Sequence, residues 1–252
     1  MSNNNTNSRR RFLSQALIGG VAVSLSPFLA LQAAFGQSSN PLRIGIIGSG
    51  RIGGSIGLRW AQAGHQVLFS SRNPDQLEAL VEQAGSNARA GYPADAAGFG
   101  DVVLVAVPYG AMPQVGRDFA PLMQDKIVID CGNPRADRDG PMAEEAIAKG
   151  TGIASAEYFP GVRLVRAFNA ISFLMVQNEA HRDGELIGVP IAGDDVEAVT
   201  VTRQLVRDAG FDPVVVGGLE RAREFDRGTD VYVRGLTAME LRNALGLPVP
   251  GI

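Results

Sequence analysis

The sequence predicts an α/β protein with a doubly wound, mainly parallel sheet. From residue 42 onward, apolar runs of four to six residues alternate with helical patterns, as they do in βαβ units. Several of these runs are continuously apolar, which is typical of strands buried on both faces. A glycine-rich turn, Gly48-Ser49-Gly50-Arg51-Ile52-Gly53, lies between the first run and the first helical pattern.

Seven runs are predicted as strands, with a weaker eighth near Ala88–Ala90: Arg43–Ile47, Gln66–Ser70, Asp101–Val107, Lys126–Asp130, Arg163–Phe168, Glu185–Ala192 and Asp212–Val216. Helices are predicted where apolar residues recur every three or four positions, such as Ile52, Ile56 and Trp60 after the glycine turn. The stretch Thr229–Leu247 also has a helical pattern. Its apolar side chains can pack on the domain or on a second subunit, so a homodimer stays open.

Composition excludes several classes of protein. The chain has 252 residues, of which 45% are hydrophobic and 19% charged, so it is not disordered or collagenous. Its net charge is −3, and the first 36 residues hold three arginines and no acidic residue, which leaves −6 on the rest. This balance argues against nucleic acid as a partner. The single cysteine, Cys131, excludes an intrachain disulfide.

The N-terminal segment has the features of an export signal. Ser8-Arg9-Arg10-Arg11-Phe12-Leu13 precedes an apolar stretch, Ala16–Leu31, and a small-residue pattern that ends at Gly36. This arrangement resembles a twin-arginine signal peptide. The apolar stretch has 16 residues and contains Pro27, whereas a bilayer span needs about 20. We therefore expect the twin-arginine export machinery as a partner, membrane contact only through this segment, and a periplasmic or extracytoplasmic location.

The glycine turn has the spacing of a dinucleotide-binding loop, GxGxxG, between a strand and a helix. In that setting Gly48 permits the tight turn, Gly50 lets the backbone approach a pyrophosphate, and Gly53 lets helix and strand pack closely. The pyrophosphate would lie at the helix N-terminus, where unpaired N–H groups favour anions. The sequence thus predicts a Rossmann-type domain at 42–225, preceded by a signal peptide at 1–36 and a linker at 37–41, and followed by a helical tail at 226–252.

The end of the second predicted strand favours NADP(H) over NAD(H). An NAD site places an acidic residue about 20 positions after the glycine loop, but here the strand ends in Ser71 and Arg72. A hydroxyl and a guanidinium suit a 2′-phosphate, because arginine forms bidentate, charge-assisted hydrogen bonds with it. The opposing interpretation, in which these residues are a solvated strand end, stays open.

Over residues 42 to 225 the chain resembles the NADP oxidoreductases that use coenzyme F-420, a deazaflavin. The landmarks are the glycine loop, Ser71-Arg72, Val107-Pro108-Tyr109, Asn133-Pro134, Val165-Arg166-Ala167-Phe168-Asn169 and Ile191-Ala192-Gly193-Asp194-Asp195. The resemblance implies a Rossmann fold with a short C-terminal extension. It also implies hydride transfer between NADP(H) and a small-molecule redox acceptor, either coenzyme F-420 or a flavin-like molecule.

The resemblance also implies positions for the site residues. Ser49, Ser71 and Arg72 would take the 2′-phosphate side, and Pro108, Tyr109 and Asn133 would lie near the ribose and nicotinamide. Phe168, Asn169 and Ile171 would face the point of hydride transfer. With the loop, the expected cofactor-binding set is Gly48, Ser49, Gly50, Arg51, Ile52, Gly53, Ser71, Arg72, Pro108, Tyr109 and Asn133.

The chain departs from the family pattern at two places. Some members have a further basic residue after the equivalent of Arg72, and some have His where this chain has Asn169. The hydride acceptor therefore stays open. Two alternatives also remain: an exported module that binds NADP without turnover, and a reductase of a small imine or carbonyl substrate similar to the pyrroline-carboxylate reductases.

Other kinds of site are disfavoured. Ser55 lies in a GxSxG pattern, but it falls inside the predicted helix and not on the strained turn that a hydrolase nucleophile needs. His65 and His181 are expected at the surface. No grouping of His, Cys or carboxylates has metal-ligand spacing, so no metal is expected. Cys131 follows a strand and is expected to be a buried, inert thiol.

Overall fold

The computed structural model describes residues 41–249, which contain an eight-stranded sheet in the order β3-β2-β1-β4-β5-β6-β7-β8. All neighbouring strands are parallel except β6 and β7. The predicted mainly parallel α/β fold is therefore confirmed. The strands are β1 Arg43–Ile47, β2 Gln66–Ser70, β3 Ala88–Gly91, β4 Val102–Val105, β5 Ile127–Asp130, β6 Arg163–Ala167, β7 Gly188–Gly193 and β8 Asp212–Gly217.

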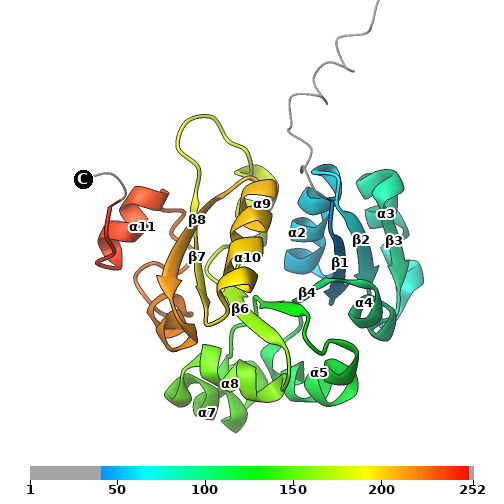
Figure 1. Cartoon of the computed structure of the whole chain (residues 1–252), viewed down its shortest axis with the longest axis horizontal. Coiled ribbons are helices and arrows are strands. Elements are labelled where there is room, and N and C mark those ends of the chain that lie inside the picture. Colours follow the sequence, from blue (N-terminus) through cyan, green and yellow to red (C-terminus); the bar gives the residue numbers. More distant parts are fainter. Residues whose placement is uncertain (1–40, 250–252) are drawn as a thin grey trace, which may run out of the picture. The chain divides into compact units, whose positions relative to one another are not determined.

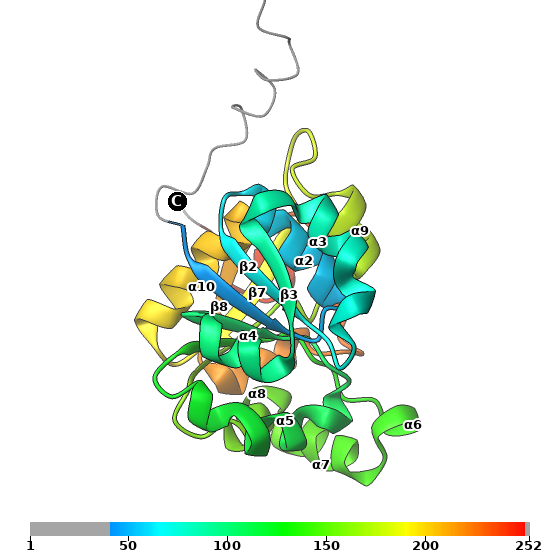
Figure 2. The same cartoon turned by 90° about the vertical axis from the view of Figure 1, so that its right-hand side faces the viewer.

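Helices connect the strands and cover both faces of the sheet. The α-helices are α2 Arg51–Gln62, α3 Glu78–Ala84, α4 Pro93–Phe99, α5 Met112–Phe119, α6 Ala136–Asp139, α7 Pro141–Lys149, α8 Thr151–Tyr158, α9 Phe173–Asn178, α10 Val196–Asp208 and α11 Ala238–Ala244. Short 3-10 helices span Pro74–Leu77, Gly85–Asn87, Tyr109–Ala111, Ala120–Leu122 and Leu219–Phe225 (η5). Helices α2, α9 and α10 lie together, whereas α5, α7 and α8 form a separate group (Figure 1, Figure 2).

The alternation of side chains along each strand divides the core into two layers. In β1, Ile44 and Ile46 pack in the same cluster as Ile56 and Trp60 of α2. Ile47 of the same strand belongs to the opposite cluster, together with residues of α4 and α5. Both faces are buried, which explains why the strands are continuously apolar in the sequence.

The predicted strands agree with the structure except at some ends. The strand predicted at Asp101–Val107 ends at Val105, because the chain turns there toward Pro108, which begins a 3-10 turn. The strand predicted at Glu185–Ala192 begins at Gly188, and Ile187 forms an isolated antiparallel bridge with Thr237. The weak strand near Ala88 is present at an edge of the sheet.

The helix in the C-terminal tail is shorter than predicted. Within Thr229–Leu247 the α-helix comprises only Ala238–Ala244. Val233 and Gly235 have φ angles of 49° and 65°, in the left-handed region, so a right-handed helix cannot continue through them. Leu236 and Leu241 nevertheless pack in one apolar cluster with β8. Residues 1–40, which include the predicted signal peptide and most of the linker, and residues 250–252 lie outside the described residues.

His65 was predicted at the surface, and that prediction is wrong: its side chain is fully buried. Its Nδ1 accepts a hydrogen bond from the Leu42 backbone N–H (3.1 Å), and its Nε2 lies 3.0 Å from Oδ2 of Asp208. Since Nδ1 accepts, the proton of the neutral ring is on Nε2 and is donated to the Asp208 carboxylate. His65 therefore joins the start of β1 to the end of α10. His181 is exposed, as predicted.

Replacing His65 by Leu should destabilise the fold. Leucine keeps similar bulk but leaves the Leu42 N–H and Oδ2 of Asp208 without their hydrogen bonds to the ring, each at a cost of about 1–3 kcal/mol. We expect the free energy of unfolding, measured in urea, to fall by about 2–4 kcal/mol. A loss below about 0.5 kcal/mol would contradict this account of the residue.

Candidate functional site

A cavity of about 320 Å³ lies where β1, β4 and β5 end, which is the edge of a parallel sheet where ligands bind. Side chains and backbone from four segments line it: Ile52, Ala106, Val107, Pro108, Cys131, Gly132, Asn133, Arg135, Arg138, Arg227 and Tyr232. The strand order brings the ends of β1, β4 and β5 side by side although they are far apart in the chain.

The glycine loop has the geometry that its spacing predicts. Gly48 has a φ of 96°, and a Cβ there would lie 2.6 Å from the Ala106 carbonyl oxygen. A Cβ on Gly53 would lie 2.3 Å from the Gly48 carbonyl oxygen, so helix α2 approaches the loop closely. Gly50 differs, because nothing lies within 4 Å of a Cβ placed there. The structure thus requires glycine at two of these positions, whereas at Gly50 the space is open to a ligand.

Helix α2 begins directly at this open space. Gly50 is its N-cap, so no side chain caps the helix, and its first turn has no acidic residue. The first N–H groups of a helix have no intrahelical partner and carry a partial positive charge. Arg51 is exposed, and its guanidinium lies over the Phe173 ring of α9 at 5.1 Å. The loop and the helix end together form a cradle suited to an anion.

The end of β2 presents two hydroxyls and a free cation beside this loop. Ser49 and Ser70 join β1 to β2 through two hydrogen bonds, one of them from the Ser70 N–H to Ser49 Oγ (2.9 Å). Ser71 Oγ accepts from the Asn73 N–H at 3.1 Å. Arg72 is exposed and has no hydrogen bond or ion pair within residues 41–249. Its guanidinium is available for a ligand.

Pro108 and Asn133 line the cavity, as predicted, but Tyr109 does not. The 3-10 turn that starts after Pro108 directs Tyr109 into the core, where its hydroxyl lies 3.0 Å from Ser155 Oγ. Burial, together with the charge of Asp130, raises the pKa of Tyr109, so the phenol stays neutral. The expectation that Tyr109 lies against a nicotinamide or ribose is therefore corrected: its side chain is a core residue.

Asn133 lines the cavity and has an acceptor oxygen that is unpaired among the described residues. Its Nδ2 donates to the Asn169 backbone carbonyl at 2.9 Å, which fixes the orientation of the amide. Its Oδ1 is buried and has no partner among the described residues. Because a buried acceptor without a partner costs free energy, this oxygen is suited to receive an N–H from a ligand.

The three residues expected to face hydride transfer do not line the cavity. Phe168 is buried with a φ of 62° and packs edge-on against Trp60 (5.7 Å between ring centroids). Ile171 belongs to the same core cluster. Asn169 is buried behind Asn133 and donates to the Phe225 carbonyl. The positive φ at Phe168 turns its side chain into the core, so these residues support the wall of the cavity from behind.

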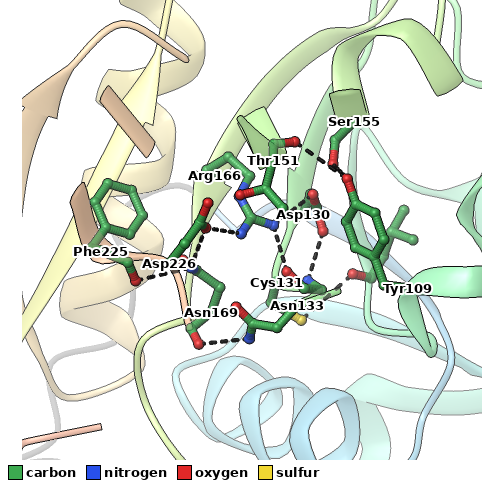
Figure 3. Close-up of polar contacts among 12 residues, drawn as sticks. Tyr109, Asp130, Cys131, Asn133, Thr151, Ser155, Arg166, Asn169, Phe225 and Asp226 are labelled. Atoms are coloured by element: carbon green, nitrogen blue, oxygen red, sulfur yellow. Dashed lines mark hydrogen bonds and ion pairs between the residues drawn. The ribbon is translucent and has the colours of Figure 1, made fainter. Parts of the chain in front are cut away.

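A buried ion network is centred on Arg166 (Figure 3). Arg166 is fully buried; its Nη1 donates to Asp130 Oδ2 and to the Gly132 carbonyl, both at 2.7 Å, and its Nη2 donates to Asp226 Oδ1 at 2.8 Å. Burial acts to lower the pKa of Arg166, but the charges of Asp130 and Asp226 more than offset it, so the guanidinium stays protonated. Burial raises the pKa of Asp226.

Sequence reasoning missed the outer wall of the cavity, which consists of Arg135, Arg138, Arg227 and Tyr232. The available signal was Arg166, a charged residue between the apolar residues Val165 and Ala167 in the interior of a strand. Such a residue requires buried partners. One of those partners, Asp226, belongs to the loop that carries Arg227 and Tyr232.

Other groups give no separate site. Ser55 lies within α2 and donates to the Arg51 carbonyl, so it is not on a nucleophile turn. Cys131 is buried, as predicted, and burial raises its pKa to about 12. In residues 41–249 no three His, Cys, Asp or Glu side chains converge as metal ligands. No helix in that range is long and apolar enough to cross a membrane.

Comparisons with known proteins agree with this geometry. Rat metalloreductase STEAP3 (Rattus norvegicus) is 30% identical over 187 residues, which cover 73% of this chain but only 36% of that protein. The F420-dependent NADP reductase of Methanothermobacter thermautotrophicus is 28% identical over 218 residues, which cover 81% of this chain and 93% of that protein. A solved structure of a hypothetical protein from Sinorhizobium meliloti superposes with a TM-score of 0.68 over 78% of this chain and 95% of that one, at 23% identity.

The sequence model of one family, described as "NADP oxidoreductase coenzyme F420-dependent", matches residues 43–134. This range runs from β1 to Pro134, shortly after β5, and so contains the glycine loop, Arg72, Pro108 and Asn133. Over residues 43–134 the chain therefore matches the coenzyme F420-dependent NADP oxidoreductases, which confirms the resemblance found in its sequence.

Proposed function

We propose that this protein transfers a hydride between NADP(H) and a deazaflavin, coenzyme F-420, or a flavin-like acceptor held in the cavity. The observation that carries the proposal is the open space at Gly50, at the uncapped N-terminus of α2, beside a cavity that Ile52 of the same helix lines. The match to the family model and the similarity to an F420-dependent NADP reductase support an activity as an NADP-dependent oxidoreductase. The choice of acceptor is our inference.

The residues around the loop fit a dinucleotide phosphate. The pyrophosphate would be bound by the free N–H groups at the start of α2. Ser49 and Ser71 keep hydroxyl protons to donate, and the unpaired guanidinium of Arg72 lies next to Ser71. These three side chains would take the 2′-phosphate, the group by which NADPH differs from NADH.

The residues of the cavity fit the reacting end of the nucleotide. Asn133 Oδ1 would accept a hydrogen bond from the carboxamide N–H of a nicotinamide, which would satisfy the unpaired buried acceptor. When bound, NADPH supplies the hydride from C4 of its ring, the acceptor ring receives it, and a proton comes from solvent. The chain therefore contributes binding, orientation and exclusion of water, and it needs no acid or base of its own.

Replacing Gly50 by Ala separates nucleotide binding from folding. The added methyl group meets no protein atom, so the melting temperature should stay within about 2 °C of wild type. The same group would occupy the space assigned to the pyrophosphate. The dissociation constant for NADPH, measured by nicotinamide fluorescence, should rise about tenfold or more, equivalent to about 1.4 kcal/mol.

The matched control is Gly98→Ala, because Gly98 lies exposed in α4 and its Cβ would also meet no atom. This variant should bind NADPH as wild type does. Unchanged NADPH affinity in Gly50→Ala would contradict the placement of the pyrophosphate.

Replacing Arg72 by Glu should abolish the preference for NADPH over NADH. The guanidinium is expected to contribute about 1.5–3 kcal/mol, or about 10- to 100-fold in affinity, and a carboxylate repels the 2′-phosphate. Paired titrations with NADPH and NADH measure the ratio. Arg203→Glu, on the exposed face of α10, makes the same charge change away from the site and should leave the ratio unaltered. Retained selectivity in Arg72→Glu would overturn this assignment.

We further propose that residues 1–36 direct export through the twin-arginine route. The support is the motif Ser8-Arg9-Arg10-Arg11-Phe12-Leu13 and the apolar stretch after it. Replacing Arg9 and Arg10 together by Lys should stop export, since Lys keeps the charge but removes the paired guanidinium groups. Arg11→Lys, at the variable position of the motif, should leave export intact. Fractionation of expressing cells measures both, and equal export of the two variants would refute the assignment.

A further inference from the structure

The outer rim of the cavity is basic, and the function proposed above does not use it. Arg135 and Arg138 come from the segment after β5, and Arg227 comes from the loop after η5. Tyr232 lies farther along the same loop and completes this rim. We call these four residues the basic rim.

The charges of the basic rim are only partly compensated. Arg135 is bonded to Asp137, and Arg138 is bonded to Asp139 and, through Nη2, to the Asn133 carbonyl (2.9 Å). About two fifths of each of these arginine side chains stays exposed (42% and 39%), so both keep N–H groups toward solvent. The pairs hold the guanidinium groups in place without covering them.

Arg227 differs from the other two arginines of the rim. It is exposed, and within residues 41–249 it has no hydrogen bond or ion pair. Its neighbour in sequence, Asp226, is committed to Arg166 beneath the wall. The carboxylate of Asp137 interacts electrostatically with Arg227, but its ion pair is with Arg135. Within the rim, three guanidinium groups therefore face two carboxylates, and the N–H groups of Arg227 stay available to a ligand.

The loop that carries Arg227 is held rigidly. Asp226 accepts from Arg166 at 2.8 Å, and its carbonyl accepts from the Thr229 hydroxyl at 2.9 Å. Farther along, the Tyr232 N–H donates to the Thr229 carbonyl and the Val233 N–H to the Ala170 carbonyl (2.9 Å). A loop fixed in this way loses little conformational entropy when a ligand binds, which favours affinity.

We propose that the basic rim recognises an acidic group, a phosphate or a carboxylate, on the hydride acceptor. This inference rests on the proposed function, because it assigns the second substrate to the same cavity. Guanidinium groups bind both kinds of anion through bidentate hydrogen bonds. Arg227 makes the main contribution, and Arg135 and Arg138 add to it.

The position of the basic rim separates it from the phosphates of the dinucleotide. Those phosphates are assigned to the loop after β1 and to Arg72 after β2. The rim arginines follow β5 and η5, and in the sheet β4 lies between β1 and β5. An anion at the rim therefore belongs to the molecule that faces the nicotinamide from the other side of the cavity.

FMN and riboflavin test this inference, because they share one ring and differ by a phosphate. In each reaction NADPH loses a hydride to the flavin ring, which also takes one proton from solvent and is reduced by two electrons. At low salt the kcat/KM of the full chain should be at least about tenfold higher with FMN than with riboflavin. A tenfold ratio corresponds to the free energy that one charged hydrogen bond contributes. The ratio should shrink as salt rises from about 0.02 M to about 0.5 M, because exposed charges are screened.

Arg227→Gln should lower the FMN-to-riboflavin ratio about tenfold and leave the dissociation constant of NADPH within about threefold of wild type. Arg203→Gln, an exposed arginine of α10, is the matched control and should keep the full ratio. Flavin fluorescence quenching measures the same preference as binding to the NADP⁺-loaded protein, without turnover.

The outcomes distinguish the inference from the proposed function. Equal use and equal binding of FMN and riboflavin by wild type would overturn the inference alone. Weaker NADPH binding in Arg227→Gln with an intact FMN preference would also overturn it, because the arginine would then serve the dinucleotide. If no flavin or deazaflavin oxidises NADPH, the proposed function fails; the rim would still be supported if FMN binds better than riboflavin and Arg227→Gln removes that difference.

Discussion

The guanidinium of Arg166, held between Asp130 and Asp226, is the contact on which the cavity depends. A charge buried at the end of a sheet is tolerated only when opposite charges and hydrogen bonds surround it. Here Asp130 lies at the end of β5, Arg166 lies in β6, and Asp226 begins the loop after η5. Loss of one partner in such a network costs about 3–5 kcal/mol. The network therefore joins strands β5 and β6 of the sheet to the loop after η5, which lines the cavity.

The same network shapes the lining residue by residue. Asp130 Oδ1 also accepts from the Gly132 N–H at 2.7 Å, and Arg166 binds the Gly132 carbonyl. These bonds fix the backbone that presents Asn133 to the cavity. On the other side, Asp226 positions Arg227. One buried charge thus supports both the wall that we assign to the nucleotide and the wall that we assign to the acceptor, while the phosphates are assigned to the glycine loop.

Local patterns were sufficient to predict the sheet and the phosphate loop. Apolar runs located the other seven strands to within a few residues, because burial on both faces favours apolar side chains, whereas the edge strand β3 is only partly buried and was weakly indicated. The tight turn at Gly48 and the close packing at Gly53 were predicted correctly, because each depends on neighbours near the same βα turn. The pyrophosphate at Gly50 stays a prediction. Pro108 and Asn133 were also predicted at the cavity, since both follow strands that end at the same edge.

Residues whose roles depend on long-range contacts could not be predicted. The direction of the Tyr109 and Phe168 side chains depends on a 3-10 turn and on a positive φ, neither of which has a reliable sequence pattern. His65 was misjudged because its partners, Leu42 and Asp208, come from distant segments. The basic rim was not predicted for the same reason: Arg138 and Arg227 have the pattern of ordinary surface residues in the sequence, and long-range contacts such as the Arg166–Asp226 pair bring them to one cavity.

The most direct test of the account is the fate of a deuterium label. The full chain is incubated with NADPH deuterated at the reactive C4 position and with an oxidised deazaflavin, whose ring carbon retains a transferred hydrogen without exchange. Direct hydride transfer in the cavity predicts that the reduced deazaflavin carries the deuterium, as mass spectrometry would show. Oxidation without label on the deazaflavin would contradict direct transfer, and tight NADPH binding without any oxidation would favour a module that binds NADP without turnover.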